Sequence, residues 1–316
     1  MTAHAPNPAP NAFVRFARKI YNPVGFTKGY NFSLYFIFAG ALFGFTLASL
    51  RKLNIKTFAS EAAPGEWFWF SRSYYKIGLL IHLGCIFPAA LLAIVQFTPI
   101  VRHKLRMVHR INGYVVILLL LTSNIGALMI ARRAFGGSLD TQAGVGVLAI
   151  STTVSAIMAY VNIKRLHIDA HRAWMLRTWF YAASIITLRI VMIISALIIS
   201  KLGGHYEVIR CEQLAFTTSA ADASKYPACV ADMNGGVAVV KADLSTAQNG
   251  MEAGVALEVS FGMALWIALT LHAVGVEIYL GCTTQESERL KKVSLERRLE
   301  RGMETIEKEE VVQEEK

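Results

Sequence analysis

Two His-Arg doublets are the residues of this chain whose types and spacing are best suited to binding chemistry. His109-Arg110 and His171-Arg172 lie 62 residues apart, and each stands where a long apolar segment begins. A cluster of cations and titratable imidazoles can hold a phosphate, a carboxylate or the rim of a haem. The doublets therefore indicate two equivalent entrances to a helical bundle.

Arg189 is the single residue whose position most strongly suggests a function. It lies in the middle of an apolar run, 10 residues after Trp179 and 11 before Ser200. A guanidinium stays protonated, and at that depth in a membrane it costs several kcal/mol unless it is paired or hydrated. Two interpretations stay open. Arg189 either bonds backbone carbonyls and hydroxyls, such as those of Thr187 or Ser184, or it binds an anionic group of a ligand.

Histidines supply the remaining candidates. His82 and His272 lie inside apolar runs, where each is either a hydrogen-bonded packing residue or a group that exchanges protons with a ligand. The boundary doublets could instead bind lipid headgroups. The candidate ligand-binding residues are His82, Arg189, His272, His109, Arg110, Asn112, His171, Arg172 and Arg177.

A haem is a second interpretation of the histidines, because two imidazoles at matched depths can bind one iron. His82 has no histidine at its own depth, whereas His109, His171 and His272 share the opposite half of the bundle. Counting residues places His272 roughly 10 Å deeper than His109. One b-type haem on these residues stays open, and two haems are not supported. No other metal site is predicted, since HExxH and CxxC motifs are absent.

Membrane-spanning helices must position these residues. The chain has 316 residues, 54% of them hydrophobic, and contains six apolar runs. Each run is long enough to cross about 30 Å of hydrocarbon as a helix, the conformation that satisfies every backbone group within one segment. The sequence therefore predicts an all-α fold, a polytopic transmembrane helical bundle. The predicted spans are 31–50, 77–101, 111–131, 143–163, 179–200 and 254–281.

The net charge of +10 could indicate a nucleic-acid partner, but its distribution argues against one. If the N-terminus is cytoplasmic, most basic residues fall in cytoplasmic segments, as the positive-inside rule requires. We therefore expect both termini in the cytoplasm and the lipid bilayer as the partner, with no nucleic acid. The expected location is the endoplasmic reticulum or a later secretory membrane. The sequence makes no prediction of the oligomeric state.

Three segments make up the predicted organisation. The tail is expected to form a solvated helix near anionic headgroups. The segments are a cytoplasmic amphipathic N-terminal segment at 1–30, the bundle at 31–281 with a long outer loop at 201–253, and a charged cytoplasmic tail at 282–316.

Two features of the outer loops lead to further predictions. Cys211 and Cys229 both fall in the long outer loop, on the oxidising side of the membrane, so we expect a disulfide between them. Aromatic residues cluster beside the second span, in Trp67-Phe68-Trp69-Phe70. We expect an interfacial belt there, and the alternative is a lid over an outer pocket. Glu258 and Glu277 are the acidic residues inside the apolar runs, and neither is placed at the depth of Arg189.

Four strings carry a family resemblance: PGEWFWF, QFTPIVRHKLRMVHRINGY, HRAWMLRTWFYAASIITLR and FGMALWIALTLHAVGVEIYL. Over about residues 20–300 the chain resembles a family of polytopic membrane proteins, the domain of unknown function 2306, and is similar to its fungal branch. The resemblance implies a multi-helix bundle and no particular activity. The family's motif positions correspond to His82, His109, Arg110, Gly113, His171, Arg172, Trp174, Met175, Arg177 and Arg189.

The leading functional hypothesis is a membrane protein that binds, and in a stronger form transforms, a lipophilic small molecule with an anionic or carbonyl group. Arg189 would hold that group, and His82 or His272 would transfer protons. A b-type haem redox protein is the first alternative. A small transporter is the second, and the lack of both a central intramembrane acid and broken helices weakens it. Whether the chain is an enzyme is left open.

Overall fold

The fold is built from long apolar helices. The structure is a computed structural model that describes residues 12–245 and 250–303. Within these ranges six helices are long and apolar enough to cross a membrane, which confirms the predicted all-α bundle and its number of spans. They are α2 (Gly29–Leu50), α5 (Ser73–Phe97), α7 (Arg106–Ile130), α8 (Leu139–Lys164), α9 (Ile168–Leu202) and α13 (Gly250–Cys282).

Many large apolar side chains lie on the outer surface of the helices, unlike those of a soluble protein. Large apolar residues point outward, with Phe36, Leu118 and Ile150 each at least 65% exposed. Small polar residues lie inside, and Ser123 and Thr152 are at most 2% exposed. Helices that face lipid tails expose apolar side chains in this way, since hydrocarbon replaces water around them. The chain is therefore a multi-pass membrane protein.

Five of the six helices begin four or more residues before their predicted starts, and the chemistry of the ends of α5 and α9 explains two of the differences. α5 ends at Phe97 because Pro99 forces Thr98 into an extended conformation (φ −73°, ψ 117°) and starts the short helix α6 (Pro99–Lys104). α9 begins at Ile168, well before the predicted start at 179. An apolar run marks the part of a helix that lies in hydrocarbon, whereas polar residues such as Arg172 extend the same helix beyond it.

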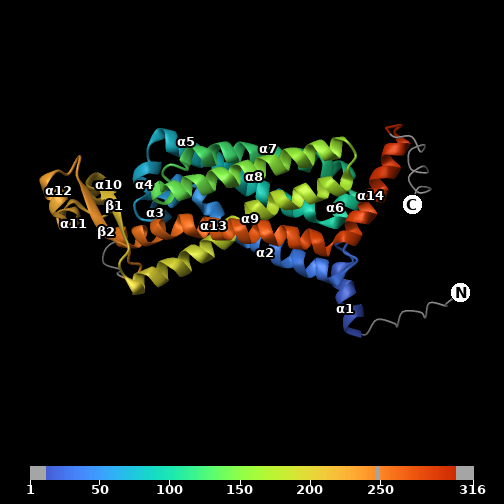
Figure 1. Cartoon of the computed structure of the whole chain (residues 1–316), viewed down its shortest axis with the longest axis horizontal. Helices are drawn as coiled ribbons and strands as arrows, with labels where there is room; N and C mark the ends of the chain where they lie inside the picture. The colour runs from blue at the N-terminus through green and yellow to red at the C-terminus, as the bar shows by residue number, and fades with distance from the viewer. Residues whose placement is uncertain (1–11, 246–249, 304–316) are drawn as a thin grey trace, which may run out of the picture. The chain divides into compact units, whose positions relative to one another are not determined.

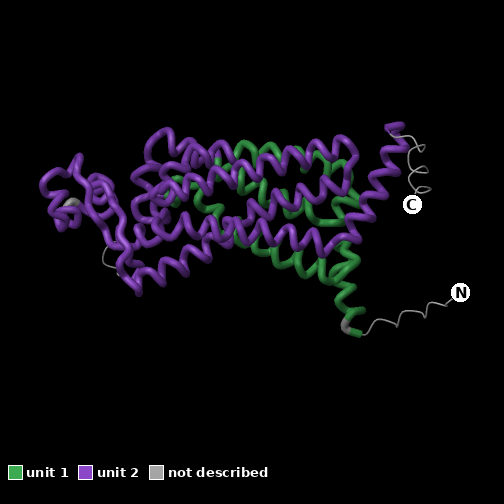
Figure 2. Tube along the Cα trace, in the orientation of Figure 1, with its two compact units in different colours: residues 1–58, 82–123 green, residues 59–81, 124–316 purple. Residues whose placement is uncertain are grey.

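The chain divides into two compact units, which Figure 2 shows in two colours. Unit 1 comprises residues 1–58 and 82–123, and unit 2 comprises residues 59–81 and 124–316. In unit 1 a hydrogen bond of 2.7 Å joins the hydroxyls of Tyr35 on α2 and Thr98 after α5. The amide of Ile100 donates to the carbonyl of Val24 at 3.1 Å. Unit 1 also holds α1 (Ala12–Tyr21) and the 3₁₀ turn η1 (Arg51–Leu53).

Unit 2 is organised around α9, which packs along both α8 and α13 (Figure 1). The interface with α13 is lined by small buried residues, including Ala196, Ala256, Ala264 and Ala268, each fully buried. Small side chains allow two helices to approach closely in a membrane, where van der Waals contact replaces the hydrophobic effect. We call the end of unit 2 where α9 ends and α13 begins the loop end, and the end where α13 meets the tail helix the tail end.

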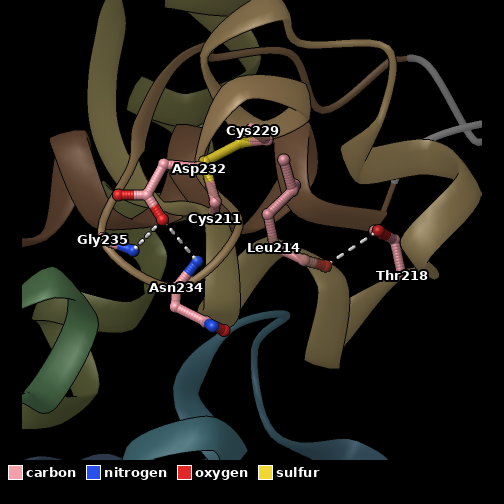
Figure 3. The surroundings of a disulfide bond; sticks show 7 residues. All are labelled: Cys211, Leu214, Thr218, Cys229, Asp232, Asn234 and Gly235. Carbon is pink, nitrogen blue, oxygen red and sulfur yellow. Dashed lines mark hydrogen bonds between the residues drawn. A yellow bond between two sulfur atoms is a disulfide. The ribbon is translucent and has the colours of Figure 1, made fainter.

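A small disulfide-linked cap follows α9 at the loop end. Its strands pair antiparallel, with Tyr206 opposite Lys241 and Arg210 opposite Val237. The predicted disulfide between Cys211 and Cys229 is present and joins two of its short helices (Figure 3). The cap elements are β1 (Tyr206–Arg210), α10 (Cys211–Thr217), α11 (Ala220–Ala223), α12 (Pro227–Ala231) and β2 (Val237–Lys241). Residues 246–249, within the predicted outer loop, lie outside the described residues.

The tail helix α14 (Thr284–Glu300) lies against the start of α9 rather than being solvated on all sides. The backbone amide of Ile168 donates to the hydroxyl of Ser294 at 2.9 Å, and Ser294 is 1% exposed. A further hydrogen bond of 3.0 Å joins Arg298 to His167. One face of this helix is therefore buried, which corrects the expectation of a fully solvated tail. Residues 304–316 lie outside the described residues.

The first prediction concerns the topology. Six spans place the two ends of the bundle on one side of the membrane, and the charge bias places that side in the cytoplasm. A protease added to sealed vesicles with the cytoplasmic face outward should remove a tag fused after Lys316. Protection of that tag, with cleavage of a tag inserted in the cap, would reverse the orientation.

The second prediction concerns the disulfide. The bond closes a segment of 18 residues, so the chain-entropy model predicts that it stabilises the cap by about 3 kcal/mol. Cys211→Ser and Cys229→Ser should each lower the thermal midpoint in detergent, and the double variant should lower it no further. The free cysteine Cys85 provides the control, since Cys85→Ser breaks no covalent bond. Equal stability of all four proteins would contradict the prediction.

Candidate functional site

A buried carboxylate lies at the loop end of unit 2, on the short helix α4 (Glu66–Phe70). Glu66 is 6% exposed and accepts two backbone hydrogen bonds, from the amide of Phe135 at 3.2 Å and from the amide of Ala63 at 3.3 Å. Gly65, with φ of 91°, turns the chain into this helix. Glu66 lies outside the apolar runs, so the sequence pattern does not predict it as a site residue. A lone acid among the aromatic residues of PGEWFWF is the signal that could have revealed it.

The loop that Glu66 holds has an unusual backbone. In the 3₁₀ turn η2 (Ala134–Gly137), Phe135 has φ 45° and ψ 61°, and Gly136 and Gly137 also have positive φ. The left-handed conformation costs a residue with a side chain about 1–2 kcal/mol. Phe135 is held there by the bond to Glu66 and by stacking on Phe261, with ring centroids 4.4 Å apart. Strain retained by such contacts is a common property of functional loops.

Arg189 lies directly on this aromatic pair. Its guanidinium carbon is 4.5 Å from the ring centroid of Phe135 and 5.8 Å from that of Phe261. Glu66 stabilises the cation electrostatically. Over residues 12–245 and 250–303 no hydrogen bond to the guanidinium is observed, and the hydroxyl of Thr187 bonds His272 instead. Among the described residues, neither Thr187 nor another hydroxyl therefore bonds Arg189, and the interpretation of Arg189 as held by hydroxyls is not supported.

A second carboxyl group borders the same loop from α13. Glu258 is 5% exposed, and its Oε2 atom has no hydrogen-bond partner in the described part of the chain. Gly136 faces it: a Cβ atom on Gly136 would lie 3.2 Å from Oε2. Glycine is thus needed at 136 for its positive φ and because the carboxyl group fills the space beside it.

Glu258 belongs to a regular row on one face of α13. Gly250, Gly254, Glu258 and Gly262 follow each other at intervals of four residues, the spacing that places side chains on one helix face. Pro64 packs against the first two, and the carboxylate of Asp140, in the first turn of α8, contacts Gly262. The glycines let polar loops approach this helix closely, and Glu258 is the charged residue in the row.

A cavity of about 250 Å³ opens beside this row at the loop end. Its wall at Ala63 is shared with the polar cluster, because Ala63 also packs against the buried cluster that contains Phe135 and Phe261, and donates its amide to Glu66. Most of the lining is apolar or aromatic, as expected for a cavity that accepts a lipophilic group. The lining residues are Ala59, Ala62, Ala63, Pro64, Gly65, Trp67, Phe68, Phe216, Thr217 and Gly250.

The aromatic cluster around α4 is part of the protein interior. Trp69 and Phe70 are 5% and 2% exposed, so the prediction of an interfacial belt is wrong for these two residues. The indole of Trp69 donates to Gln213 in the cap at 3.2 Å, and the guanidinium of Arg133 lies 3.5 Å from its ring centroid. α4 therefore connects the strained loop to the cap.

The two intramembrane histidines of the sequence hypothesis are hydrogen-bonded within the bundle. In unit 2, the Nε2 atom of His272 bonds the hydroxyl of Thr187 at 2.8 Å and its Nδ1 atom bonds the carbonyl of Phe180 at 2.7 Å. In unit 1, His82 bonds the hydroxyl and the carbonyl of Ser123 at 2.9 Å and 3.1 Å. These contacts join helices to one another, and within unit 2 no hydrogen bond of His272 goes to Arg189.

The first His-Arg doublet forms a polar cluster in unit 1. The side-chain amide of Gln96 donates to the carbonyl of His109 at 3.0 Å, and Asn112 donates to Gln96 at 2.9 Å and to the carbonyl of Leu92 at 3.0 Å. Arg110 is exposed. Asn112, 8% exposed, is thus held by the protein itself.

The second doublet lies at the tail end of unit 2. His171 bonds the carbonyl of Ala159 at 2.8 Å, which joins α9 to α8. Arg172 donates to the hydroxyl of Thr283 at 3.0 Å, and its Nη1 atom is buried with no partner in residues 12–245 and 250–303. One turn further along α9, Arg177 is paired with a carboxylate.

That carboxylate is Glu277, which accepts two hydrogen bonds from Arg177 at 2.7 Å and 2.9 Å. The pair neutralises Arg177, and half of the Glu277 side chain is exposed. Two-point pairing of this kind is the strong form of an arginine–carboxylate contact. Arg177 is therefore less suited to an external anion than Arg189.

The histidines of unit 2 do not fit a haem bound between them. Both ring nitrogens of His272 are already bonded, so neither is available to an iron. The pairing of Arg172 with Thr283 places His171 about twelve residues along α13 from His272, roughly 18 Å at the helical rise. In the described part of the chain no three His, Cys, Asp or Glu residues are grouped as metal ligands would be.

Comparison with known proteins supports the membrane fold and the family resemblance. Residues 79–220 match the model of the family described as predicted membrane protein (DUF2306), which confirms the resemblance that the sequence strings indicated. The chain is 27% identical over 326 aligned positions to Ava biosynthesis cluster protein G of Aspergillus versicolor, covering 86% of this chain and 94% of that protein. No solved structure matches the chain significantly.

The third prediction tests the role of Glu66. Glu66→Ala removes the acceptor of two backbone amides, and each buried donor left unpaired costs about 1–3 kcal/mol. We expect a clearly lower thermal midpoint in detergent, whereas Glu66→Gln, which keeps an acceptor oxygen, should lose less. Glu61→Ala, at an exposed glutamate five positions away, is the control. If Glu66→Ala is as stable as that control, Glu66 does not hold the loop.

Proposed function

We propose that this multi-pass membrane protein binds a lipophilic small molecule carrying an anionic or carbonyl group at the loop end of unit 2. The observation that carries the proposal is the state of Arg189. Its guanidinium lies on the faces of Phe135 and Phe261, at 4.5 Å and 5.8 Å, with no hydrogen bond from the described residues. An arginine has five N–H donors in a planar fork, and here they are available to a ligand.

The cluster also offers a place for the apolar part of such a molecule. The cavity lined by Trp67, Phe68 and Phe216 shares its Ala63 wall with the polar cluster. Small-molecule sites are typically apolar cavities with a few polar groups that fix the orientation. A volume of about 250 Å³ accepts one ring system or a short branched chain.

The relative from Aspergillus versicolor supports a role with small molecules rather than a purely structural one. Its name assigns that protein to a biosynthesis cluster. A membrane protein of similar length and sequence would handle an intermediate or product that partitions into lipid. Binding is the core of the proposal, and a chemical transformation would further require a group that transfers protons to the ligand.

The fourth prediction tests Arg189 with two substitutions. Arg189→Leu removes a largely buried cation, so the empty protein should unfold at the same or a higher temperature than the wild type. Addition of a total membrane lipid extract should raise the midpoint of the wild type and not that of Arg189→Leu. Arg189→Lys keeps the charge but loses the planar fork, so its shift should be smaller. Arg132→Leu, at an exposed arginine two residues before η2, should behave as wild type.

Two results would contradict this function. A large loss of stability for Arg189→Leu without lipid extract, restored in Arg189→Leu/Glu66→Gln, would show that Arg189 only balances the buried charge of Glu66. A Soret band in the purified protein would favour the haem interpretation instead, because a bound b-type haem absorbs strongly in that region.

A further inference from the structure

We infer that the ligand's polar group is a neutral carbonyl, and that Glu258 donates a hydrogen bond to it while Arg189 donates a second. This inference rests on the proposed function and narrows it, since an anionic group is the other possibility. It assigns Glu258 a binding role, as a carboxylic acid in the wall of the site.

The carboxyl group of Glu258 is buried, and the described residues do not use its hydrogen-bonding capacity. The residue is 5% exposed, and no described residue donates a hydrogen bond to its Oε2 atom. The carboxyl group lies so close to Gly136 that no side chain would fit between it and the loop. An ionised carboxylate that is buried without donors costs many kcal/mol, so a group in this position is accommodated as the neutral acid. The acid then has an O–H to donate, and no hydrogen bond to Oε2 from the described residues occupies this side of the group.

The acidic groups already present at the site disfavour an anionic ligand. Glu66 accepts from the amide of Phe135, and Glu258 lies against the next residue, Gly136, so the two carboxyl groups border consecutive positions of one loop. If both were ionised they would repel each other, which also favours the neutral form of Glu258. A carboxylate ligand would add a second negative charge beside Glu66, which would offset part of its attraction to Arg189.

The two proposed donors, Glu258 and Arg189, come from different helices, α13 and α9. Glu258 and Phe261 are three residues apart on α13, so their side chains lie on neighbouring parts of one helix face. Arg189 packs against the ring of Phe261 from α9. Glu258 lies against Gly136 and Arg189 lies over the ring of Phe135, so the acid and the guanidinium border consecutive residues of one loop from two helices. A carbonyl oxygen has two lone pairs and can accept one hydrogen bond from each.

Glu277, on the same helix, is an acid whose hydrogen bonds are made within the protein. It accepts two hydrogen bonds from Arg177, and half of its side chain is exposed. Its hydrogen-bonding capacity is used by the protein, whereas that of Glu258 is not. Glu277 is therefore the matched control for substitutions of Glu258.

The experiment compares three probes of equal chain length on the full chain in detergent. They are 2-undecanone (a neutral carbonyl), undecanoate (an anion) and undecane (no polar group), at equal mole fraction in the micelle. Binding is followed by the thermal midpoint and by the fluorescence of Trp69, whose ring centroid lies 4.8 Å from that of the cavity-lining Phe68. Trp69→Phe identifies the part of the signal that comes from this indole.

We expect 2-undecanone to bind the wild type more tightly than undecanoate at neutral pH, and undecane to bind least. Glu258→Met, which keeps the volume but removes the donor, should weaken 2-undecanone binding about tenfold, the effect of losing one hydrogen bond of about 1.4 kcal/mol. Glu258→Gln should stay within about threefold of wild type, because its amide also donates. Glu277→Gln should leave the binding of all three probes unchanged. Should Glu258→Met fail to fold, the Gln variant and the probe order still carry the test.

The failures of the inference and of the proposed function can be told apart. Undecanoate binding more tightly than 2-undecanone, and requiring Arg189, would keep the proposed function and overturn the inference. A gain in undecanoate binding in Glu258→Gln would show that Glu258 is ionised in the wild type, which also overturns the inference. Wild-type affinity of Glu258→Met for the ketone would do the same. If no probe depends on Arg189, the proposed function fails and the inference fails with it.

Discussion

The hydrogen bonds between the Glu66 carboxylate and two backbone amides are the constraint on which the loop end of unit 2 depends. They fix the left-handed turn at Phe135, and that turn places an aromatic ring on the guanidinium of Arg189. Without an acceptor at this point, two buried amides would be unpaired and the strained turn would lose its restraint. The same helix joins the cap through the bond of Trp69 to Gln213.

Aromatic faces replace water around the charges at this end. Arg133 lies over Trp69 and Arg189 lies over Phe135, so each cation meets the negative face of a ring. Such contacts stabilise a desolvated guanidinium without using its hydrogen-bond donors. A cation held in this way is stable in the empty protein and is still able to bind a ligand. Hydrogen bonds to protein carbonyls would have stabilised Arg189 equally well, but would have occupied its donors.

The tail end uses its polar residues differently. Arg177 is neutralised by Glu277, and Ser294 of the tail helix accepts from the first amide of α9. His272, between the two ends, bonds α9 to α13 with both ring nitrogens. These contacts pair buried groups with one another and join the helices of unit 2. The Nη1 atom of Arg172, at the same end, is nevertheless buried with no partner among the described residues. At the loop end, Arg189 and Glu258 also have hydrogen-bonding capacity that the described residues do not use.

The sequence by itself determined the class of fold, the number of spans and the disulfide. Each of these follows from a local property: the length of an apolar run, or a pair of cysteines in one loop. It also identified Arg189, since a lone cation in an apolar run is costly wherever the helix packs. Only the tertiary structure decided which residues surround it. Glu66 comes from a short helix outside the apolar runs, and Phe135 comes from a turn whose φ no pattern revealed. Their proximity depends on side-chain reach and on a loop folded back over the helix ends, and periodicity along one chain contains no information about either.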